Sequence, residues 1–263
     1  MLHHAALATV LATGTLIYAS LMHEPDLADF HTSELKGILL DARPALAADA
    51  TLTDSRAQFA DLIMRYAEKE NARMLAANAL IDAAIARQTQ HLDNSSTDPA
   101  LALLMQYFGV PEVENLDALA VSLKKRAAPL PPKLVAAQAA IESAWGTSRF
   151  ATEGMNLFGH QCYSKGCGIK PLDRPERSNL EVRRFQSVGD SVAAYYQNIN
   201  SHRAYRQLRN TRLALIEQSA PLTAQALIPS LGAYSERGSA YLRSLRSLLK
   251  SEYLMIAADH RTP

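Results

Sequence analysis

The sequence has very little cysteine, with only Cys162 and Cys167 among its 263 residues. Two thiols cannot complete a tetrahedral zinc site, and no histidine pair stands at ligand spacing beside them, although His160 is close. We therefore expect no metal centre, and no motif in the chain indicates a cofactor. A short segment separates the two cysteines, so a small disulfide loop is favoured over free thiols if the protein is exported to an oxidising compartment.

Net charge is also nearly absent, at a formal +1. Hydrophobic residues make up 48% of the chain and charged residues 20%, a balance that allows an ordinary globular core. The low net charge gives no overall attraction to nucleic acid, which is therefore not an expected partner. Arginines do cluster in the second half, and we expect most of them to be solvated and a minority to face an anionic polymer. They are Arg174, Arg177, Arg183, Arg184, Arg203, Arg206, Arg209 and Arg212.

Charged side chains are missing altogether from residues 5–22. A run of that length can serve as the core of a signal peptide or, barely, as a membrane-spanning helix. The run departs from a usual signal peptide in that no lysine or arginine precedes it. Acidic Glu24, Asp26 and Asp29 follow it and the first lysine is Lys36, a distribution that fits an N-terminus inside and a body outside. We expect residues 1–22 to be a signal peptide or an inner-membrane anchor, with the remaining protein periplasmic or secreted. The alternative is a buried helix in a cytosolic protein.

Helical spacing organises much of the remaining chain. Residues 23–53 lack sustained periodicity and contain Pro25 and Pro44, so we interpret them as a linker. A helical N-terminal region follows over residues 54–128, and a cluster of prolines at 129–132 then marks a domain boundary. The helices predicted in this region cover 54–90, 99–108 and 115–126.

The second predicted domain covers residues 129–254, with 255–263 as a tail. Its first helix ends before Gly146, and a stretch rich in glycine, proline and serine then covers 160–180. Residues 181–185 are a strand candidate, and residues 187–190 form a capping box that opens another helix. Further helices are predicted over 202–209, 211–219, 223–231 and 239–254. The expected fold is α+β and mostly α, with one small β lobe.

One acidic residue, Glu142, lies near the end of the first helix of this domain, among alanines, Ile141 and Trp145. Burying a charge without a partner is strongly unfavourable, so such a carboxyl either keeps its proton with a raised pKa or is satisfied by hydrogen bonds. In the first case it can donate a proton in catalysis, and in the second it is a structural residue. The spacing alone leaves both interpretations open.

Several blocks of sequence around Glu142 resemble one enzyme family. The segment IESAWG is followed by NLFG at 156–159, by GCG at 166–168, by EVRRFQSVGDSVAAYYQNINSHRAYRQLR and by AYSERGSAYLRSLR. In this order they resemble the N-acetylglucosaminidases of glycoside hydrolase family 73, most closely their Bax-type branch. The resemblance covers about residues 130–254, and a weaker one reaches the predicted helix at 59–87.

The resemblance implies a lysozyme-like domain that cleaves β-1,4 bonds after N-acetylglucosamine, with peptidoglycan glycan strands as its partner. By the match of its motif, Glu142 is the general acid that protonates the leaving oxygen. Tyr234 matches a tyrosine near the catalytic cleft, where its hydroxyl could orient the sugar's acetamido group in a substrate-assisted route. The expected substrate-binding residues are Trp145, Asn156, Phe158 and Gly159.

A second carboxylate is expected in most glycosidases, and its distance from the acid decides the stereochemistry. Glu181 matches the position of an acidic residue in the Bax-type branch, although Leu180 stands where relatives often carry a histidine. Glu176 and Asp173 are the substitutes, and an exposed structural charge is the alternative for all three.

Two other functions remain open. A lytic transglycosylase shares the lysozyme-like fold and a catalytic glutamate, but typically continues into a Gly-Leu-Met-Gln motif, whereas NLFG at 156–159 favours hydrolysis. A cell-wall-binding or scaffold module with little turnover is the alternative from another class. Amidase activity is not expected because no metal constellation is visible.

Overall fold

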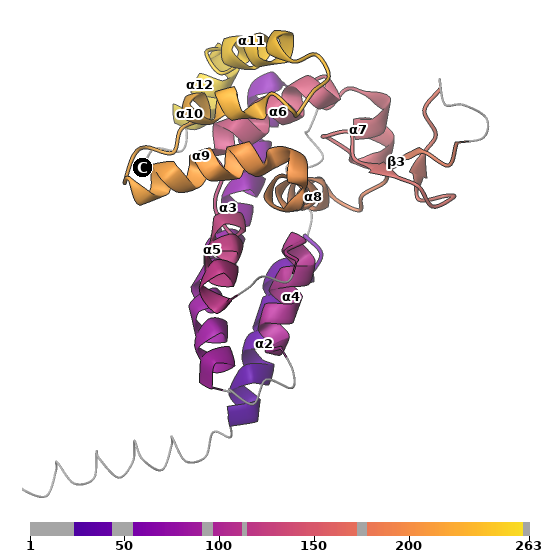
Figure 1. The fold of residues 1–263 in the computed structure, drawn as a ribbon. Coiled ribbons are helices and arrows are strands. Elements are labelled where there is room, and N and C mark those ends of the chain that lie inside the picture. Colours follow the sequence, from indigo (N-terminus) through magenta and orange to yellow (C-terminus); the bar gives the residue numbers. More distant parts are fainter. Residues whose placement is uncertain (1–23, 44–54, 91–96, 112–114, 173–177, 260–263) are drawn as a thin grey trace, which may run out of the picture.

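A computed structural model of the chain describes residues 24–43, 55–90, 97–111, 115–172 and 178–259. Helices dominate these residues and a small antiparallel sheet accompanies them, so the predicted fold, α+β and mostly α, is confirmed (Figure 1). The α-helices are α2 (Glu24–Leu40), α3 (Arg56–Gln90), α4 (Pro99–Phe108), α5 (Leu116–Arg126), α6 (Pro132–Ser143), α7 (Arg149–Gly154), α8 (Val188–Ser201), α9 (Arg206–Glu217), α10 (Ala224–Leu227), α11 (Ser239–Leu248) and α12 (Glu252–Asp259). Two 3-10 segments are η2 (Arg203–Tyr205) and η3 (Ile228–Leu231).

Helix α3 is the central element of the fold. Its 35 residues make it about 50 Å long. In Figure 1, α2, α4 and α5 gather around its lower part, and α6 and the later helices surround its upper part. Its buried side chains recur at helical spacing and join one hydrophobic core with α6 and α8. They include Phe59, Ile63, Tyr66, Met74 and Ile81. The three helices predicted at 54–90, 99–108 and 115–126 are therefore confirmed as α3, α4 and α5.

Helix α2 corrects the interpretation of residues 23–53 as a linker, because Glu24–Leu40 forms a 17-residue helix. Leu35 and Leu39 lie one turn apart and are both buried in the core, which the helix reaches by packing on α3 and α4. Pro25 falls in the first turn, where a helix does not need the missing N–H group. The predicted apolar segment 5–22 and the rest of the predicted linker lie outside the described residues. Within the described residues, no helix is both long and apolar enough to cross a bilayer.

The C-terminal helices divide differently from the prediction. The predicted helices at 202–209 and 211–219 are instead the short η2 segment and one continuous helix, α9. The single helix predicted at 239–254 is broken after Leu248 into α11 and α12. The break turns α12 onto α3 and α6, where Leu254 is fully buried, so tertiary packing outweighs the local helical pattern.

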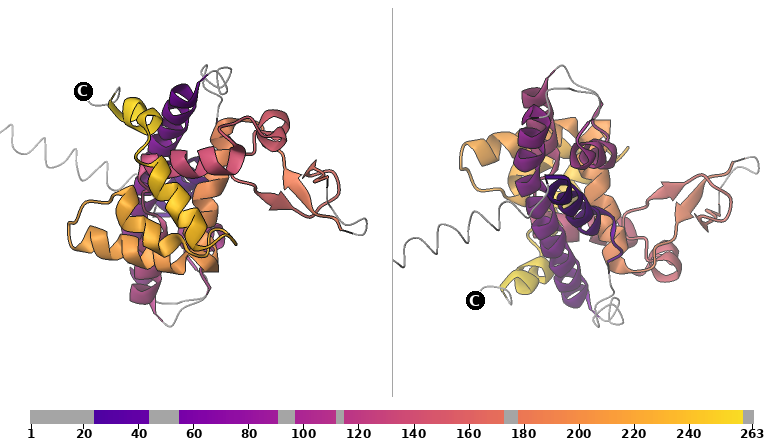
Figure 2. Two further views of the ribbon diagram at one scale, coloured as in Figure 1. Left: turned by 90° about the horizontal axis from the view of Figure 1, so that it is seen from above. Right: turned by 90° about the horizontal axis from the view of Figure 1, so that it is seen from below.

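The β lobe projects from the helical body, as the views from above and below show (Figure 2). Its strands are β1 (Gln161–Cys162), β2 (Gly168–Ile169) and β3 (Glu181–Arg183), with β3 in the centre and antiparallel to both neighbours. The strand predicted at 181–185 is thus confirmed over its first part. Cys162 and Cys167 form a disulfide bond across Cα atoms 6.3 Å apart. Gly168 is required by sterics, because a Cβ atom there would lie 2.0 Å from the Val182 carbonyl oxygen.

Candidate active site

Glu142 lies in the last turn of α6, at a sharp change of chain direction. Residues 144–146 all have left-handed backbone conformations, with φ values of 51°, 59° and 78°. The Ser143 hydroxyl supports the turn by donating to the Ala139 carbonyl (2.6 Å) and accepting from the Gly146 N–H (2.8 Å). Left-handed non-glycine residues are strained and tend to occur at functional sites. The turn leaves Glu142 exposed at the helix end while Ser143 is fully buried.

A cleft of about 630 Å³ opens beside Glu142. It is bounded by the end of α6, the turn at 158–160, strands β1 and β3, helix α8 and the segments that follow α8 and precede α11. Its lining residues are Glu142, Phe158, Gly159, His160, Gln161, Tyr163, Arg183, Ala194, Gln197, Asn198, Ser201, His202, Tyr205 and Tyr234. Four of the residues predicted from the sequence therefore lie together here, namely Glu142, Tyr234, Phe158 and Gly159.

A chain of hydrogen bonds runs behind Glu142. The Tyr195 hydroxyl donates to Oε1 of Gln138 (2.6 Å), and Nε2 of Gln138 donates to the Tyr241 hydroxyl oxygen (3.0 Å). Because this oxygen accepts from Gln138, its own proton is available for the Glu142 carboxyl, with which Tyr241 is hydrogen-bonded. Gln138, Tyr195 and Tyr241 are buried, so the chain fixes the orientation of the carboxyl.

Tyrosine rings crowd the Glu142 carboxyl. Tyr234 stacks on Tyr241 with ring centroids 5.5 Å apart and is tilted against Tyr205 at 5.8 Å. Although Glu142 is exposed as a residue, the loss of solvent around its carboxyl raises its pKa, while the Tyr241 hydrogen bond and the Arg237 charge act in the opposite direction. Burial raises the pKa of Tyr234 well above its ordinary value, so its hydroxyl keeps its proton and can donate it in a hydrogen bond.

Asn156 does not line the cleft but holds the turn that does. Its amide donates to the carbonyl oxygens of His160 (2.9 Å) and Arg183 (2.8 Å), and its Oδ1 accepts from the N–H groups of Phe158 (3.3 Å) and His160 (3.0 Å). Its side chain is 2% exposed. A buried asparagine with both ends paired ties the turn to β3 and so fixes the cleft edge.

The turn itself presents Phe158 and Gly159 to the cleft. The Phe158 ring stacks on Tyr195 with centroids 4.3 Å apart, which connects the turn to the hydrogen-bond chain behind Glu142. Gly159 has a φ of 71°, a conformation that favours glycine, and no atom lies within 4 Å of the position that a Cβ would take. This exposed position therefore leaves open space at the cleft edge.

Glu181 lies in β3, away from the lining of the cleft. Its side chain is 2% exposed, and its carboxylate accepts hydrogen bonds from the backbone N–H groups of Gly166 (3.2 Å) and Gly168 (2.8 Å). Its oxygens approach the sulfur atoms of Cys162 and Cys167, but those atoms are bonded to each other and are not free thiolate ligands for a metal. In this arrangement Glu181 holds the disulfide loop. Glu176 and Asp173, the predicted substitutes, lie outside the described residues.

Trp145 packs on the helical body rather than in the cleft. Its ring meets Phe59 of α3 and Tyr253 of α12 edge-on, at centroid distances of 5.8 and 5.7 Å, and the Arg56 guanidinium lies 5.3 Å from its centroid. The left-handed turn after Glu142 turns this side chain away from the lining of the cleft. Trp145 thus anchors the end of α6 to α3.

His160 is a cleft residue that the sequence did not single out as part of the site. Its two ring nitrogens are buried, and their contact with the Ala194 backbone falls short of ordinary hydrogen-bond geometry. Burial lowers its pKa to about 4, and the Arg183 charge acts in the same direction. The ring is therefore neutral at ordinary pH. Gln138 was also not predicted as a site residue. Its signal in the sequence is a polar side chain one helical turn before Glu142 in an alanine-rich helix.

Comparisons with known proteins show the family of this chain. Residues 118–254 match the glucosaminidase family, described as mannosyl-glycoprotein endo-beta-N-acetylglucosaminidase, and this stretch is more than half of the chain. The chain therefore belongs to the glucosaminidase family, a family of glycosidases. It is 36% identical over 137 residues to the protein bax of Escherichia coli (strain K12), a match that covers 52% of this chain and 48% of that protein. The chain thus matches about half the length of this curated relative. No solved structure matched the chain.

Proposed function

We propose that the protein is a peptidoglycan hydrolase that cleaves β-1,4 glycosidic bonds after N-acetylglucosamine, with Glu142 as general acid. The observation that carries this proposal is the setting of Glu142, a carboxyl with a raised pKa at a cleft, hydrogen-bonded to a buried tyrosine. A glycosidase acid must be protonated before the bond breaks, and partial desolvation shifts the pKa of Glu142 in the direction that favours the protonated form. Membership of the glucosaminidase family supports the same substrate chemistry.

Once Glu142 has given its proton to the leaving oxygen, it is an anion and needs stabilisation. The Tyr241 hydroxyl and the Arg237 charge both favour the ionised form. Groups that favour the anion stabilise the charge that develops on Glu142 as the bond breaks. Burial thus favours the protonated carboxyl of Glu142 before the reaction, and these two groups favour its anion afterwards.

The position of Glu181 favours a substrate-assisted route over attack by a second carboxylate. Its carboxylate is engaged by the amides of the disulfide loop and does not line the cleft. Tyr234, in contrast, lines the cleft with Glu142. We propose that the acetamido group of the sugar acts as nucleophile and that the Tyr234 hydroxyl orients it by donating a hydrogen bond.

We also propose that the protein acts outside the cytoplasm, in the periplasm. The disulfide bond between Cys162 and Cys167 supports this location, because such bonds persist in oxidising compartments. The same proposal includes residues 5–22, which would act either as a signal peptide or as a membrane anchor. Detection of the processed or unprocessed N-terminus in membrane and periplasmic fractions tests it.

Mass spectrometry of muropeptides released from purified sacculi tests the reaction. We expect products with N-acetylglucosamine at the reducing end from the wild type, and a loss of about a hundredfold or more with Glu142→Gln. Anhydro-muramic products would instead identify a lytic transglycosylase. Equal release by both proteins would remove Glu142 from the mechanism, and retained binding without release by either would identify a scaffold.

A further inference from the structure

A second cavity, of about 410 Å³, adjoins the cleft along helix α8. Arg183, Ala194 and Gln197 line both cavities. The α8 residues that line the second cavity are Asp190, Ala193, Ala194 and Gln197. Those that line the cleft are Ala194, Gln197, Asn198 and Ser201. These positions follow one another every three or four residues, so they lie on one face of the helix. The two cavities therefore adjoin along a 14-residue helix that is about 21 Å long, and we refer to them together as the groove.

The N-terminal helices close the far end of this groove. Its wall there consists of Leu39, Leu40, Asp41, Ala42 and Arg43, at and after the end of α2, and of Tyr107 in α4. All of these residues precede residue 118, where the match to the glucosaminidase family begins. The far end of the groove is thus built by a part of this chain outside the family match.

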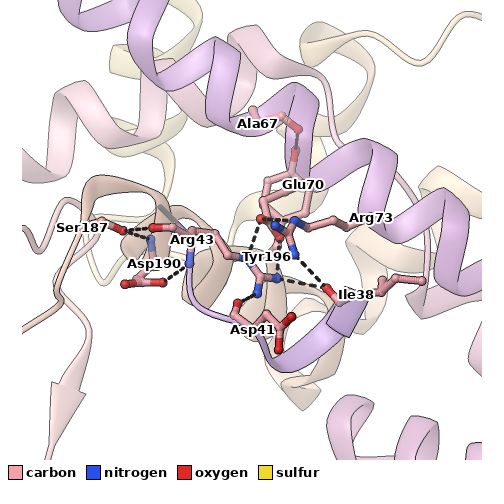
Figure 3. A network of polar contacts seen from close by, with 9 residues as sticks. All are labelled: Ile38, Asp41, Arg43, Ala67, Glu70, Arg73, Ser187, Asp190 and Tyr196. Carbon is pink, nitrogen blue, oxygen red and sulfur yellow. Dashed lines mark hydrogen bonds and ion pairs between the residues drawn. The ribbon is translucent and has the colours of Figure 1, made fainter. Parts of the chain in front are cut away.

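A polar network fixes this wall in place (Figure 3). The Arg43 backbone N–H donates to Asp190 (2.8 Å), and the Ser187 hydroxyl donates to the Arg43 carbonyl oxygen (2.6 Å). The Arg43 guanidinium pairs with the buried Glu70 carboxylate of α3 at 2.9 Å. The start of α8 therefore binds the chain that follows α2, and the groove wall is held rigidly against both α8 and α3.

Arg183, at the junction of the two cavities, is a cation without an anionic partner among the described residues. Among the described residues its guanidinium has no ion-pair or hydrogen-bond partner, and it lies 4.9 Å from the centroid of the Phe185 ring. The other two arginines of the second cavity are engaged, Arg43 by Glu70 and Arg184 by the Glu153 carbonyl oxygen (2.6 Å). Of the two acids there, Asp190 binds the Arg43 backbone, and Asp41 is exposed. Arg183 is exposed and therefore available to a ligand.

We propose that the groove holds a peptidoglycan strand across both cavities and that Arg183 binds a carboxylate of that strand. This inference rests on the proposed function. Muramic acid units carry a lactyl group that is joined to a peptide stem, so the carboxylate comes either from the stem or, where the stem has been removed, from the lactyl group. A guanidinium stacked on an aromatic ring suits such a planar anion. The exposed Leu40 and Ala42 supply an apolar wall for the rest of the stem.

Three substrates identify the carboxylate: peptide-bearing strands, strands stripped by an amidase so that the lactyl carboxylate is free, and neutral chitooligosaccharides. We expect Arg183→Gln to raise KM or the dissociation constant about tenfold for at least one charged substrate and to leave the value for the neutral one unchanged. A loss confined to the peptide-bearing strands assigns the stem carboxylate, and a loss with stripped strands assigns the lactyl group. Equal effects on all three substrates would overturn the proposal. Arg246→Gln, an exposed arginine of α11 outside both cavities, is the control.

A matched leucine pair tests whether the N-terminal wall takes part. Leu40 is 57% exposed and lines the second cavity, whereas Leu75 of α3 is 55% exposed and does not. Leu40→Glu places a repelling charge in the groove and should weaken binding of charged strands about tenfold, whereas Leu75→Glu should not. Equal binding of charged strands by these two variants would show that the N-terminal wall takes no part in binding. Binding is measured in the Glu142→Gln background, so loss of cleavage does not affect it. If the unsubstituted protein neither binds nor cleaves any strand, the proposed function itself fails and this inference falls with it.

Discussion

Gln138 and Glu142 lie one turn apart on α6, and the Tyr241 hydroxyl contacts both, accepting a hydrogen bond from Gln138 and bonding to the Glu142 carboxyl. Gln138 is fully buried and also accepts from Tyr195. Gln138 therefore determines how the Tyr241 hydroxyl is oriented toward the Glu142 carboxyl. The orientation of the Glu142 carboxyl depends on this buried amide as well as on the cleft.

Replacing Gln138 by methionine should damage both stability and catalysis. The change leaves the Tyr195 and Tyr241 hydroxyls without their buried partner, which should lower the free energy of unfolding by roughly 1–3 kcal/mol. The freed Tyr241 should also orient Glu142 less well and lower kcat. Urea unfolding and muropeptide release measure the two effects. In a double-mutant cycle with Tyr241→Phe the losses should not add, and strict additivity would show that the two residues act independently.

The descending limb of the pH profile of kcat should follow the pKa of Glu142. The Arg237 charge lowers that pKa, so Arg237→Gln should raise it and keep the acid protonated to higher pH. We expect the limb to move to higher pH. Arg246→Gln provides a control of equal charge change on the surface. A shift to lower pH would contradict the assignment of Glu142 as the acid.

Tyr234 and Glu181 should respond differently to loss of their polar groups. Tyr234→Phe removes the hydroxyl proposed to orient the acetamide, and kcat should fall about a hundredfold with little change in stability. Glu181→Gln weakens the hold on the disulfide loop and should lower stability by roughly 1–3 kcal/mol, with a smaller loss of kcat. Thermal melts and initial rates separate the two patterns. The reverse pattern would return Glu181 to the centre of the mechanism.

His160 should contribute to loss of stability in acid. Its pKa is about 4 in the folded protein against an ordinary value of 6.5, so the unfolded chain binds the proton first as the pH falls. The stability that neutral His160 provides is fully present above pH 6.5 and is lost between 6.5 and about 4, by roughly 3 kcal/mol in total. Urea unfolding from pH 7 to 4 should show this loss in the wild type and a smaller one in His160→Gln. Equal pH dependence of the free energy of unfolding in both proteins would show that His160 does not contribute to this loss.

The extent to which the sequence predicted this structure varies with the range of the interactions involved. The helices α3, α4 and α5 were predictable because apolar residues at helical spacing act locally. Helix α2 was missed because its sequence pattern is weak and its stability comes from Leu35 and Leu39 packing on α3 and α4. The break between α11 and α12 was missed for the same reason, since α12 turns to meet α3.

The capping box predicted at residues 187–190 illustrates the difference within one turn. Ser187 does accept a hydrogen bond from the Asp190 N–H (3.0 Å), as the local pattern indicates. The Asp190 carboxylate, however, accepts from the Arg43 backbone, 147 residues earlier in the chain. The local motif therefore sets the start of the helix, whereas the carboxylate of its last residue, Asp190, binds a segment that is distant in the sequence.

The candidate site shows the same division between features set by local interactions and features set by long-range ones. By itself, the sequence determined that Glu142 lies near the end of an apolar helix that stops before Gly146, because neighbouring residues set that end. Only the tertiary structure decided that Trp145 packs on α3, that Glu181 faces the disulfide loop, and that Arg183, unpaired within the described part of the chain, lies in a groove completed by α2. Each of these depends on contacts between segments far apart in the chain, and such contacts form only when the whole core has packed.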